Sequence, residues 1–227
     1  MSGTRRYVVL RYVVLGAGAV GGGIGGLLAR SGHQVVLVAR GAHLAALRAR
    51  GLTLMTPART QVVPVSVAGS VAEVRWRAGD VALLATKLQD AGPLLDELVA
   101  TARVAPPVVC ATNGLAAERM VARRGLAPYG MMVWTPATHL VPGEVRVHGG
   151  EPAGVLDLGR WPEGTDELAF AVAQDLTLAG FDAMARADIR RWKRAKLLTN
   201  VVGAMLAVDR ERALELKGAL MDEGRAV

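Results

Sequence analysis

A glycine-rich turn between two apolar runs constrains the fold of this chain more than any other feature. The turn has the pattern G-x-G-x-x-G and consists of Gly16, Ala17, Gly18, Ala19, Val20 and Gly21. Residues 12–15 before it are β-branched and aromatic, as expected of a buried parallel strand. Apolar residues follow at helical spacing as far as Ser31, and residues 35–39 form a second apolar run. This order of strand, turn, helix and strand is typical of a dinucleotide-binding βαβ unit.

Each glycine of the turn has a separate expected role. Gly16 allows the tight turn, Gly18 lets backbone N–H groups approach a pyrophosphate, and Gly21 lets the helix pack against the strand. The helix N-terminus then offers unpaired N–H groups and its positive dipole end to the phosphates. Because the chain contains 27 glycines, a glycine-rich turn in some other βαβ unit is the alternative. The flanking strands and helix favour nucleotide binding.

Arg40 directly follows the second apolar run and bears on the choice of cofactor. NAD-binding sites usually carry Asp or Glu at this point, to bind the ribose 2′-hydroxyl, whereas Arg suits a 2′-phosphate. The alternative is a solvated loop residue in an Arg-rich chain. We therefore expect NADPH as the cofactor.

Composition excludes several other classes of protein. The chain has 227 residues, 52% of them hydrophobic, which is enough to bury a sizeable core. We expect no membrane span, because the apolar runs are too short, and no signal peptide. Cys110 is the single cysteine, which excludes an intrachain disulfide and fits a reducing cytoplasm. The net charge is +7, but the Arg residues are scattered and aromatics are only 4%, so nucleic acid is not expected as a partner, and the histidines lack metal-ligand spacing.

The remaining pattern predicts an α/β fold, with a Rossmann-like parallel sheet followed by an incomplete C-terminal α-helical domain. The boundary is expected at the linker 159–164, giving an NADP-binding domain over 1–160 and a partial helical domain over 161–227. Strands are predicted at 80–86, 108–112 and 131–135, a hairpin-like pair at 52–55 and 61–67, and antiparallel edge strands within 136–158. Helices are predicted at 43–50, 92–102, 115–124, 166–179, 188–208 and 210–227.

The N-terminus carries a direct repeat, in which residues 6–10 are copied as residues 11–15. Only the second copy adjoins Gly16, so only this copy can be the first strand. A strand through both copies would bury Arg11 unpaired, which is costly. The first copy is therefore expected to be an exposed arm or a start-site artefact.

Three polar or aromatic residues near the C-terminus have helical spacing. Trp192, Lys196 and Asn200 lie four residues apart, which places them on one helix face among apolar neighbours. A partly desolvated lysine is the proton donor that a ketone reductase needs at the carbonyl oxygen. The alternative is a surface lysine that extends its charge into water within the basic run 190–194.

Lys87 and Asn113 each follow a predicted strand of the parallel sheet. Ligands of such sheets bind outside the carboxyl ends of the strands, so both residues are expected to face the cofactor. The alternatives are a loop cation for Lys87 and a turn-forming Asn before Gly114.

Taken together, these residues resemble the ketopantoate reductase (2-dehydropantoate 2-reductase) family. The matching pieces follow the family order: Gly16–Gly21, Val38–Gly41, Ala85–Lys87, Thr112–Leu115, and Trp192–Lys196 with Asn200. The resemblance implies NADPH-dependent reduction of a 2-keto acid, either 2-dehydropantoate on the way to pantothenate or a related substrate. It also implies that Lys196 is the general acid, that Asn113 and Lys87 position nicotinamide and substrate, and that Asn200 contacts the substrate. The implied partner is this small molecule; the sequence leaves the oligomeric state open, with a homodimer as one option.

Two departures from the family pattern bear on activity. The family usually has a second Asn one turn beyond Asn200, where this chain reads Val202-Gly203-Ala204. Family members also continue for several helices, which carry a Ser and a Glu that bind the substrate, whereas this sequence stops at Val227. The chain is therefore expected to be truncated at its C-terminus. The alternative function is an NADP(H)-binding fragment that reduces ketopantoate poorly or not at all.

Overall fold

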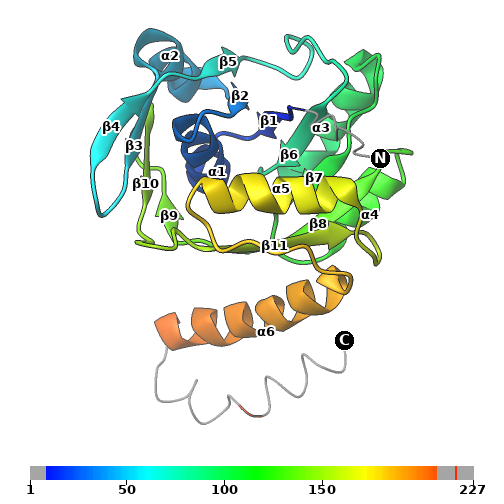
Figure 1. Cartoon of the computed structure of the whole chain (residues 1–227). Helices are drawn as coiled ribbons and strands as arrows, with labels where there is room; N and C mark the ends of the chain where they lie inside the picture. The colour runs from blue at the N-terminus through cyan, green and yellow to red at the C-terminus, as the bar shows by residue number, and fades with distance from the viewer. Residues whose placement is uncertain (1–8, 209–217, 219–227) are drawn as a thin grey trace, which may run out of the picture.

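A seven-stranded, almost entirely parallel sheet forms the centre of the protein (Figure 1). The computed structural model describes residues 9–208 and Gly218, with backbone only for 201–208. The strand order is β5-β2-β1-β6-β7-β8-β11. The strands are β1 (Arg11–Leu15), β2 (Gln34–Val38), β5 (Ser66–Ala68), β6 (Asp80–Leu84), β7 (Val108–Cys110), β8 (Pro128–Trp134) and β11 (Val155–Arg160). All neighbours pair in parallel except β11, which runs antiparallel to β8.

The order of the strands fixes where a ligand can bind. From β1 the chain builds outward through β2 and β5, then returns to the other side of β1 with β6 and continues to β8. The direction of building therefore reverses between β1 and β6. Ligands of open parallel sheets bind at this point, beyond the carboxyl ends of the strands. The predicted α/β class with a Rossmann-like sheet is confirmed.

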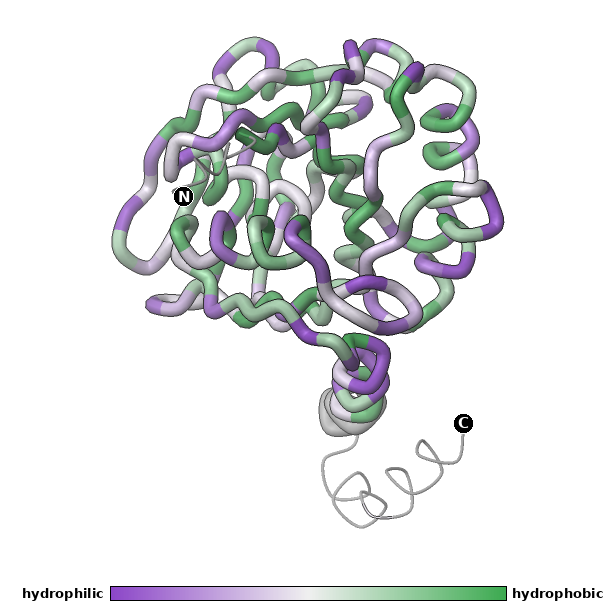
Figure 2. The backbone as a smooth tube through the Cα atoms, turned by 45° about the vertical axis from the view of Figure 1, so that its right-hand side comes forward, coloured by the Kyte–Doolittle hydropathy of each residue, from purple (hydrophilic) through white to green (hydrophobic). Residues whose placement is uncertain are grey.

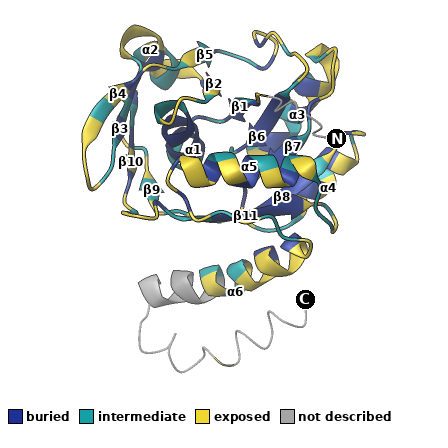
Figure 3. Ribbon diagram, in the orientation of Figure 1, coloured by how far each residue is buried: buried dark blue, intermediate teal, exposed yellow. Residues whose placement is uncertain are grey.

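Helices cover both faces of the main sheet, which explains why its strands are apolar throughout. On one face lie α1 (Ala19–Arg30) and α5 (Glu167–Leu178), and on the other lie α3 (Leu88–Thr101) and α4 (Ala116–Ala122) (Figure 3). Val14 of β1 packs in the cluster with α1 and α5, whereas its neighbours Val13 and Leu15 pack in the cluster with α3 and α4. Helix α2 (Gly41–Arg50) lies near β5 at the sheet edge.

A second, four-stranded sheet covers the outer side of α1. Its order is β4-β3-β10-β9, with β3 (Leu52–Met55), β4 (Thr60–Val63), β9 (Ala137–Thr138) and β10 (Glu144–Val147). The glycines of α1 allow this close packing. A Cβ on Gly22 would lie 2.7 Å from a methyl of Val145, and one on Gly26 would lie 2.7 Å from a methyl of Leu52. The glycine-rich helix is thus packed between two sheets.

The second sheet corrects two predictions. The segment 61–67 is not one strand, because it divides at Pro64: β4 pairs with β3 as a hairpin, while β5 joins the main sheet beside β2. Proline lacks the N–H that a continuous ladder needs. Of the strands within 136–158, β9 and β10 belong to the second sheet, and β10 runs parallel to β3. Only β11 is the predicted antiparallel edge strand.

Arg11 is not the unpaired charge that the repeat argument assumed. It lies within β1, and its Nε and Nη2 donate to the two carboxylate oxygens of the buried Asp80 on β6, at 2.7 and 2.6 Å. A charged residue can lie in this strand, since the neighbouring strand β6 supplies the opposite charge. The first copy of the repeat lies mostly in residues 1–8, outside the described residues.

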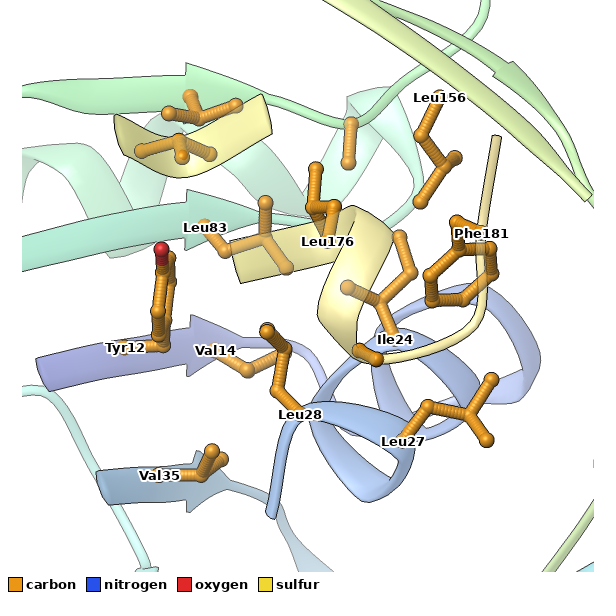
Figure 4. Close-up of a cluster of buried hydrophobic side chains, with 14 of the residues drawn as sticks. Tyr12, Val14, Ile24, Leu27, Leu28, Val35, Leu83, Leu156, Leu176 and Phe181 are labelled. Atoms are coloured by element: carbon orange, nitrogen blue, oxygen red, sulfur yellow. The ribbon is translucent and has the colours of Figure 1, made fainter. Parts of the chain in front are cut away.

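Helix α5 shares the core of the main sheet, although the predicted boundary at 159–164 would place it in a separate domain. Leu176 packs with Ile24 and Leu28 of α1, and Phe181 after the helix closes the same cluster (Figure 4). The chain then returns along β11, where Leu156 N–H donates to Asp182 O at 2.8 Å. This packing favours a boundary after α5 and its return segment.

Helix α6 (Ile189–Val208) extends away from this body (Figures 1 and 2). Its first turns contact β8 and β11, and Ile189 is fully buried there. Within the part of the chain that the structure describes, no helix is long and apolar enough to cross a membrane. The predicted helix 210–227 lies outside the described residues.

Candidate active site

The glycine turn connects the carboxyl end of β1 to α1 and lies against the end of β6. Gly16 has a φ of +104°, and a Cβ there would lie 3.0 Å from the backbone nitrogen of Thr86. A Cβ on Gly21 would lie 2.0 Å from the carbonyl oxygen of Gly16. A Cβ on Gly18, in contrast, would meet no heavy atom within 4 Å. Two glycines are thus required by packing, and the third faces open space at the start of the helix.

The surroundings of this turn suit a phosphate group. Gly18 is the N-cap of α1, and the first turn of the helix carries no acidic residue. The first N–H groups of a helix lack intrahelical acceptors and point outward, where they and the helix dipole attract anions. Arg40 lies exposed between β2 and α2, with its Nη2 3.9 Å from Asp90 Oδ1. An exposed pair at this distance is weak, so the guanidinium is available to a ligand.

His43 fixes the position of the glycine turn, a role that the sequence did not reveal. Gly143 N–H donates to His43 Nδ1 at 2.9 Å, so the proton of the neutral ring is on Nε2, which donates to Ala17 O at 2.9 Å. Burial, and then the charge of His139, lower the pKa of His43. The neutral ring therefore links the turn to the β9–β10 loop.

A cavity of about 280 Å³ lies beside the glycine turn and brings several predicted site residues together. Its lining consists of Val20, Ala111, Asn113, Val133, Trp134, Thr135, Pro136, Lys196 and Asn200. Lys196 Nζ donates to Asn200 Oδ1, and Asn200 Nδ2 donates to Asn113 Oδ1 at 3.2 Å. Helix α6 and the turn after β7 thus meet through a chain of three polar side chains. Val20 places the start of α1 at the same cavity.

The environment of Lys196 is partly apolar. Burial lowers the pKa of its ammonium group from the ordinary value of 10.5. Its Nζ lies 5.0 Å from the centre of the Trp134 ring, within the range of a cation–π interaction. A half-buried ammonium that opens into a cavity can give up a proton there more readily than a fully solvated one.

Several of the predicted site residues do not line this cavity, namely Lys87, Trp192, Arg40 and the turn residues other than Val20. Lys87 is exposed at the N-terminus of α3, beyond the end of β6. Trp192 lies on α6 but donates its indole N–H to Asp188 Oδ1 at 3.2 Å, and Arg186 stacks 4.3 Å from its ring centre. The spacing of four residues therefore joins Lys196 to Asn200 but does not bring Trp192 into the cavity.

Lys193 belongs to the basic run 190–194 that the alternative for Lys196 took as a solvated face, but Lys193 itself is not solvated. The residue is buried, with a relative exposure of 3%, and its Nζ lies 2.5 Å from Glu118 Oε1. The usable signal was the spacing of four residues from Ile189, which is fully buried. Among the described residues, no group of His, Cys, Asp and Glu side chains could hold a metal ion.

Comparison with known proteins places this chain in a family. A model of the family described as "Ketopantoate reductase PanE/ApbA" matches residues 12–163. The chain is 28% identical over 206 residues to the 2-dehydropantoate 2-reductase of Pyrococcus horikoshii, covering 88% of this chain but only 65% of that relative's length.

Solved structures agree on the fold. A PanE/ApbA family ketopantoate reductase from Ralstonia eutropha JMP134 has a TM-score of 0.81 at 26% identity, covering 96% of this chain and 73% of that one. A ternary structure of D-mandelate dehydrogenase with NADH and anilino(oxo)acetate has a TM-score of 0.77, covering 88% and 65% of the two chains. At 22% identity, the second likeness concerns the fold alone. Because the family match covers well over half of the sequence, this chain belongs to the ketopantoate reductase PanE/ApbA family.

Proposed function

We propose that this chain binds NADPH and carries the proton donor for reduction of a 2-keto acid, 2-dehydropantoate or a related compound. One observation carries the proposal: a single cavity is lined both by Val20 of the glycine turn and by the polar chain of Asn113, Asn200 and Lys196. A cofactor bound at the turn and a substrate bound beside Lys196 would therefore meet. Membership of the family supports a nicotinamide cofactor.

The residues of the site fit such a cofactor. Open space at Gly18 and the acid-free start of α1 accommodate a pyrophosphate, and Arg40 suits a 2′-phosphate. When bound, a nicotinamide cofactor supplies the hydride that becomes bonded to the keto carbon. Lys87 follows β6 close to the turn and is exposed. We propose that its positive charge contacts the cofactor and the substrate. The turn residues 16–21 and Asn113 complete the proposed cofactor contacts.

Lys196 is the proposed general acid. As the π bond of the carbonyl group breaks and an alkoxide forms, the ammonium stabilises the developing negative charge and then donates a proton to the oxygen, so that a 2-hydroxy acid forms. Asn200 accepts a hydrogen bond from Nζ and thereby orients it, while its own amide is oriented by Asn113. The apolar wall of Val133 and Pro136 limits access of water to this proton.

Substitution of Lys196 tests the proposal. Lys196→Ala should lower kcat for NADPH oxidation with a panel of 2-keto acids by about 10²- to 10⁴-fold, while NADPH affinity stays nearly unchanged. Since only the protonated amine is an acid, wild-type kcat should fall as pH rises through a pKa below 10.5. Arg194→Ala, an exposed position on the same helix, is the matched control. Wild-type turnover by Lys196→Ala would place the proton donor elsewhere.

A second candidate function is NADP(H) binding without turnover. The observation that favours it is that the sequence reads Val202-Gly203-Ala204, where the resemblance leads us to expect a second Asn one turn beyond Asn200. Calorimetry with NADPH and steady-state assays distinguish the two candidates. Saturable binding with turnover at background supports the second candidate, whereas robust turnover by this chain excludes it.

A further inference from the structure

The ion pair between Lys193 and Glu118 lies beside the site but has no place in the proposed reaction. Lys193 is on the first half of α6, and Glu118 is on α4. Their side chains have relative exposures of 2% and 0%. A pair this deeply buried rarely increases stability over apolar residues of the same size, because desolvation cancels the attraction. Its presence beside the site therefore calls for an explanation other than stability.

The hydrogen bonds of Lys193 supply that explanation. Its Nζ donates to the carbonyl oxygens of Cys110 and Thr112, at 3.3 and 2.8 Å, as well as to Glu118 Oε1. An ammonium group has three protons, and here all three have acceptors. Two of these acceptors belong to the end of β7 and to the residue directly before Asn113. The ammonium thus joins three elements, namely α6, α4 and the turn that carries Asn113.

The same helix presents Lys196 less than one turn further on. Lys193 and Lys196 line one small cavity of about 10 Å³, together with Thr112 and Asn113. The two lysines of α6 therefore adjoin the same turn, the one that carries Asn113. The chain from Lys196 through Asn200 to Asn113 closes between α6 and the turn at 3.2 Å. It can form only while those two elements keep their separation.

We propose that Lys193 and Glu118 are positioning residues, a buried clamp that holds the Asn113 turn against α6 so that Asn113, Asn200 and Lys196 stay in hydrogen-bonding register. This inference rests on the proposed function, because it assigns the clamp to the orientation of the general acid. Neither residue touches the reacting atoms. Lys193 acts through the carbonyls of the turn, and Glu118 holds the ammonium in place.

The test replaces both charges at once. The double variant Lys193→Met/Glu118→Leu leaves no unpaired buried charge but removes a donor from the carbonyl oxygens of Cys110 and Thr112. We therefore expect it to fold with a Tm lowered by about 5 °C. With the clamp gone, kcat for a 2-keto acid should fall by about 10- to 100-fold, the cost of a small misplacement, while the Kd for NADPH changes less than about twofold. Arg194→Met, on the exposed side of the same helix, is the control and should change neither.

A second readout does not depend on turnover. The only lysines of the chain are Lys87, Lys193, Lys196 and Lys217, so isotope-labelled lysine gives few NMR signals, and Lys196→Ala identifies the signal of interest. In the double variant, the Lys196 amine should titrate at higher pH than in the wild type, because the loosened helix exposes it to water. If the double variant does not fold, Glu118→Gln, which keeps an acceptor oxygen, should show a smaller shift in the same direction.

These measurements distinguish a failure of the clamp proposal from a failure of the proposed function. A folded double variant with unchanged kcat and unchanged Lys196 titration would overturn the clamp, even if the chain is a reductase. An unshifted Lys196 titration in Glu118→Gln would do the same where the double variant fails to fold. If the wild type reduces no 2-keto acid, the proposed function fails, and the titration of Lys196 still decides whether the pair positions it.

Discussion

Arg40 is the residue whose substitution most directly tests which cofactor the chain binds. Arg40→Asp should raise the Kd for NADPH by about 10- to 100-fold, because it removes a charge-assisted contact and adds repulsion to the 2′-phosphate. Asp90, whose carboxylate lies 3.9 Å from the guanidinium, would add to that repulsion. The Kd for NADH should change by less than about threefold, since NADH lacks this phosphate. Fluorescence titration with both cofactors measures the two effects.

The matched control for this substitution is Arg50→Asp. Arg50 is exposed at the other end of α2, about 15 Å along the helix, and the substitution changes the net charge by the same amount. It should leave both affinities close to those of the wild type. Equal affinity for NADPH and NADH before and after substitution of Arg40 would show that Arg40 does not select the cofactor.

At the scale of single residues, the sequence predicted the positions that end parallel strands better than those buried between helices. Asn113, Lys196 and Asn200 line one cavity. Their positions could be predicted because strand ends and helical spacing are local properties of the sequence. The burial of Lys193 cannot be predicted from the sequence around it, because it depends on Glu118, 75 positions away along the chain. No local pattern specifies such a partner. The same reason hid the pairing of Arg11 with Asp80.

At the scale of elements, two glycines at the start of helix α1 have different roles: one is required by packing, and the other is proposed to leave room for a ligand. Gly21→Ala should lower the free energy of unfolding by about 1–3 kcal/mol, because its methyl group would lie 2.0 Å from Gly16 O and 2.8 Å from Ala85 Cβ. Gly18→Ala should leave stability almost unchanged, since its methyl group meets no atom within 4 Å. It should instead weaken NADPH binding by about tenfold, or roughly 1.4 kcal/mol, by occupying the space of the pyrophosphate.

Urea unfolding and NADPH titration of the two glycine variants measure these effects side by side. Each variant is the other's control, because both add one methyl group to the same turn. The interpretation of the turn as a phosphate site is wrong if Gly18→Ala binds NADPH as the wild type does. The packing account is wrong if Gly21→Ala unfolds at the wild-type urea concentration.

The same helix shows why sequence predicted the main sheet but not the second one. The strands of the main sheet are continuous apolar runs joined by helices, and this pattern identifies a parallel sheet directly. The second sheet pairs β3 with β10, which lies about 90 residues later, and its strands are only two to four residues long. The sequence indicates the β3–β4 hairpin and strands within 136–158, but it indicates their packing on α1 only through the extra glycines of that helix, which face Val145 and Leu52. These glycines indicate that something packs closely on α1, but they do not identify which segment of the chain it is.

At the scale of the whole molecule, the position of α5 decides where the cofactor-binding unit ends. A chain that ends at Arg160, the boundary expected from sequence, would lose the buried side chains of Val172, Leu176 and Phe181. Burial of each such side chain contributes about 1.5–3 kcal/mol, so their loss is comparable to the 5–15 kcal/mol that stabilises an ordinary domain. It would also remove Arg186, whose Nε lies 2.9 Å from the buried carboxylate of Asp157. We expect this shorter chain not to fold cooperatively.

A chain that ends at Asp188 keeps α5, the return segment along β11 and every proposed cofactor contact, and loses α6 with Lys193 and Lys196. It should unfold in one cooperative transition in urea, because Glu118 becomes open to water once α6 is absent and is then no longer an unpaired buried charge. It should bind NADPH with a Kd within about threefold of that of the full chain, because the proposed cofactor contacts remain. It should show no turnover. Cooperative unfolding of the chain that ends at Arg160, with NADPH binding intact, would instead place the boundary before α5 and make the packing of Leu176 and Phe181 a contact between domains.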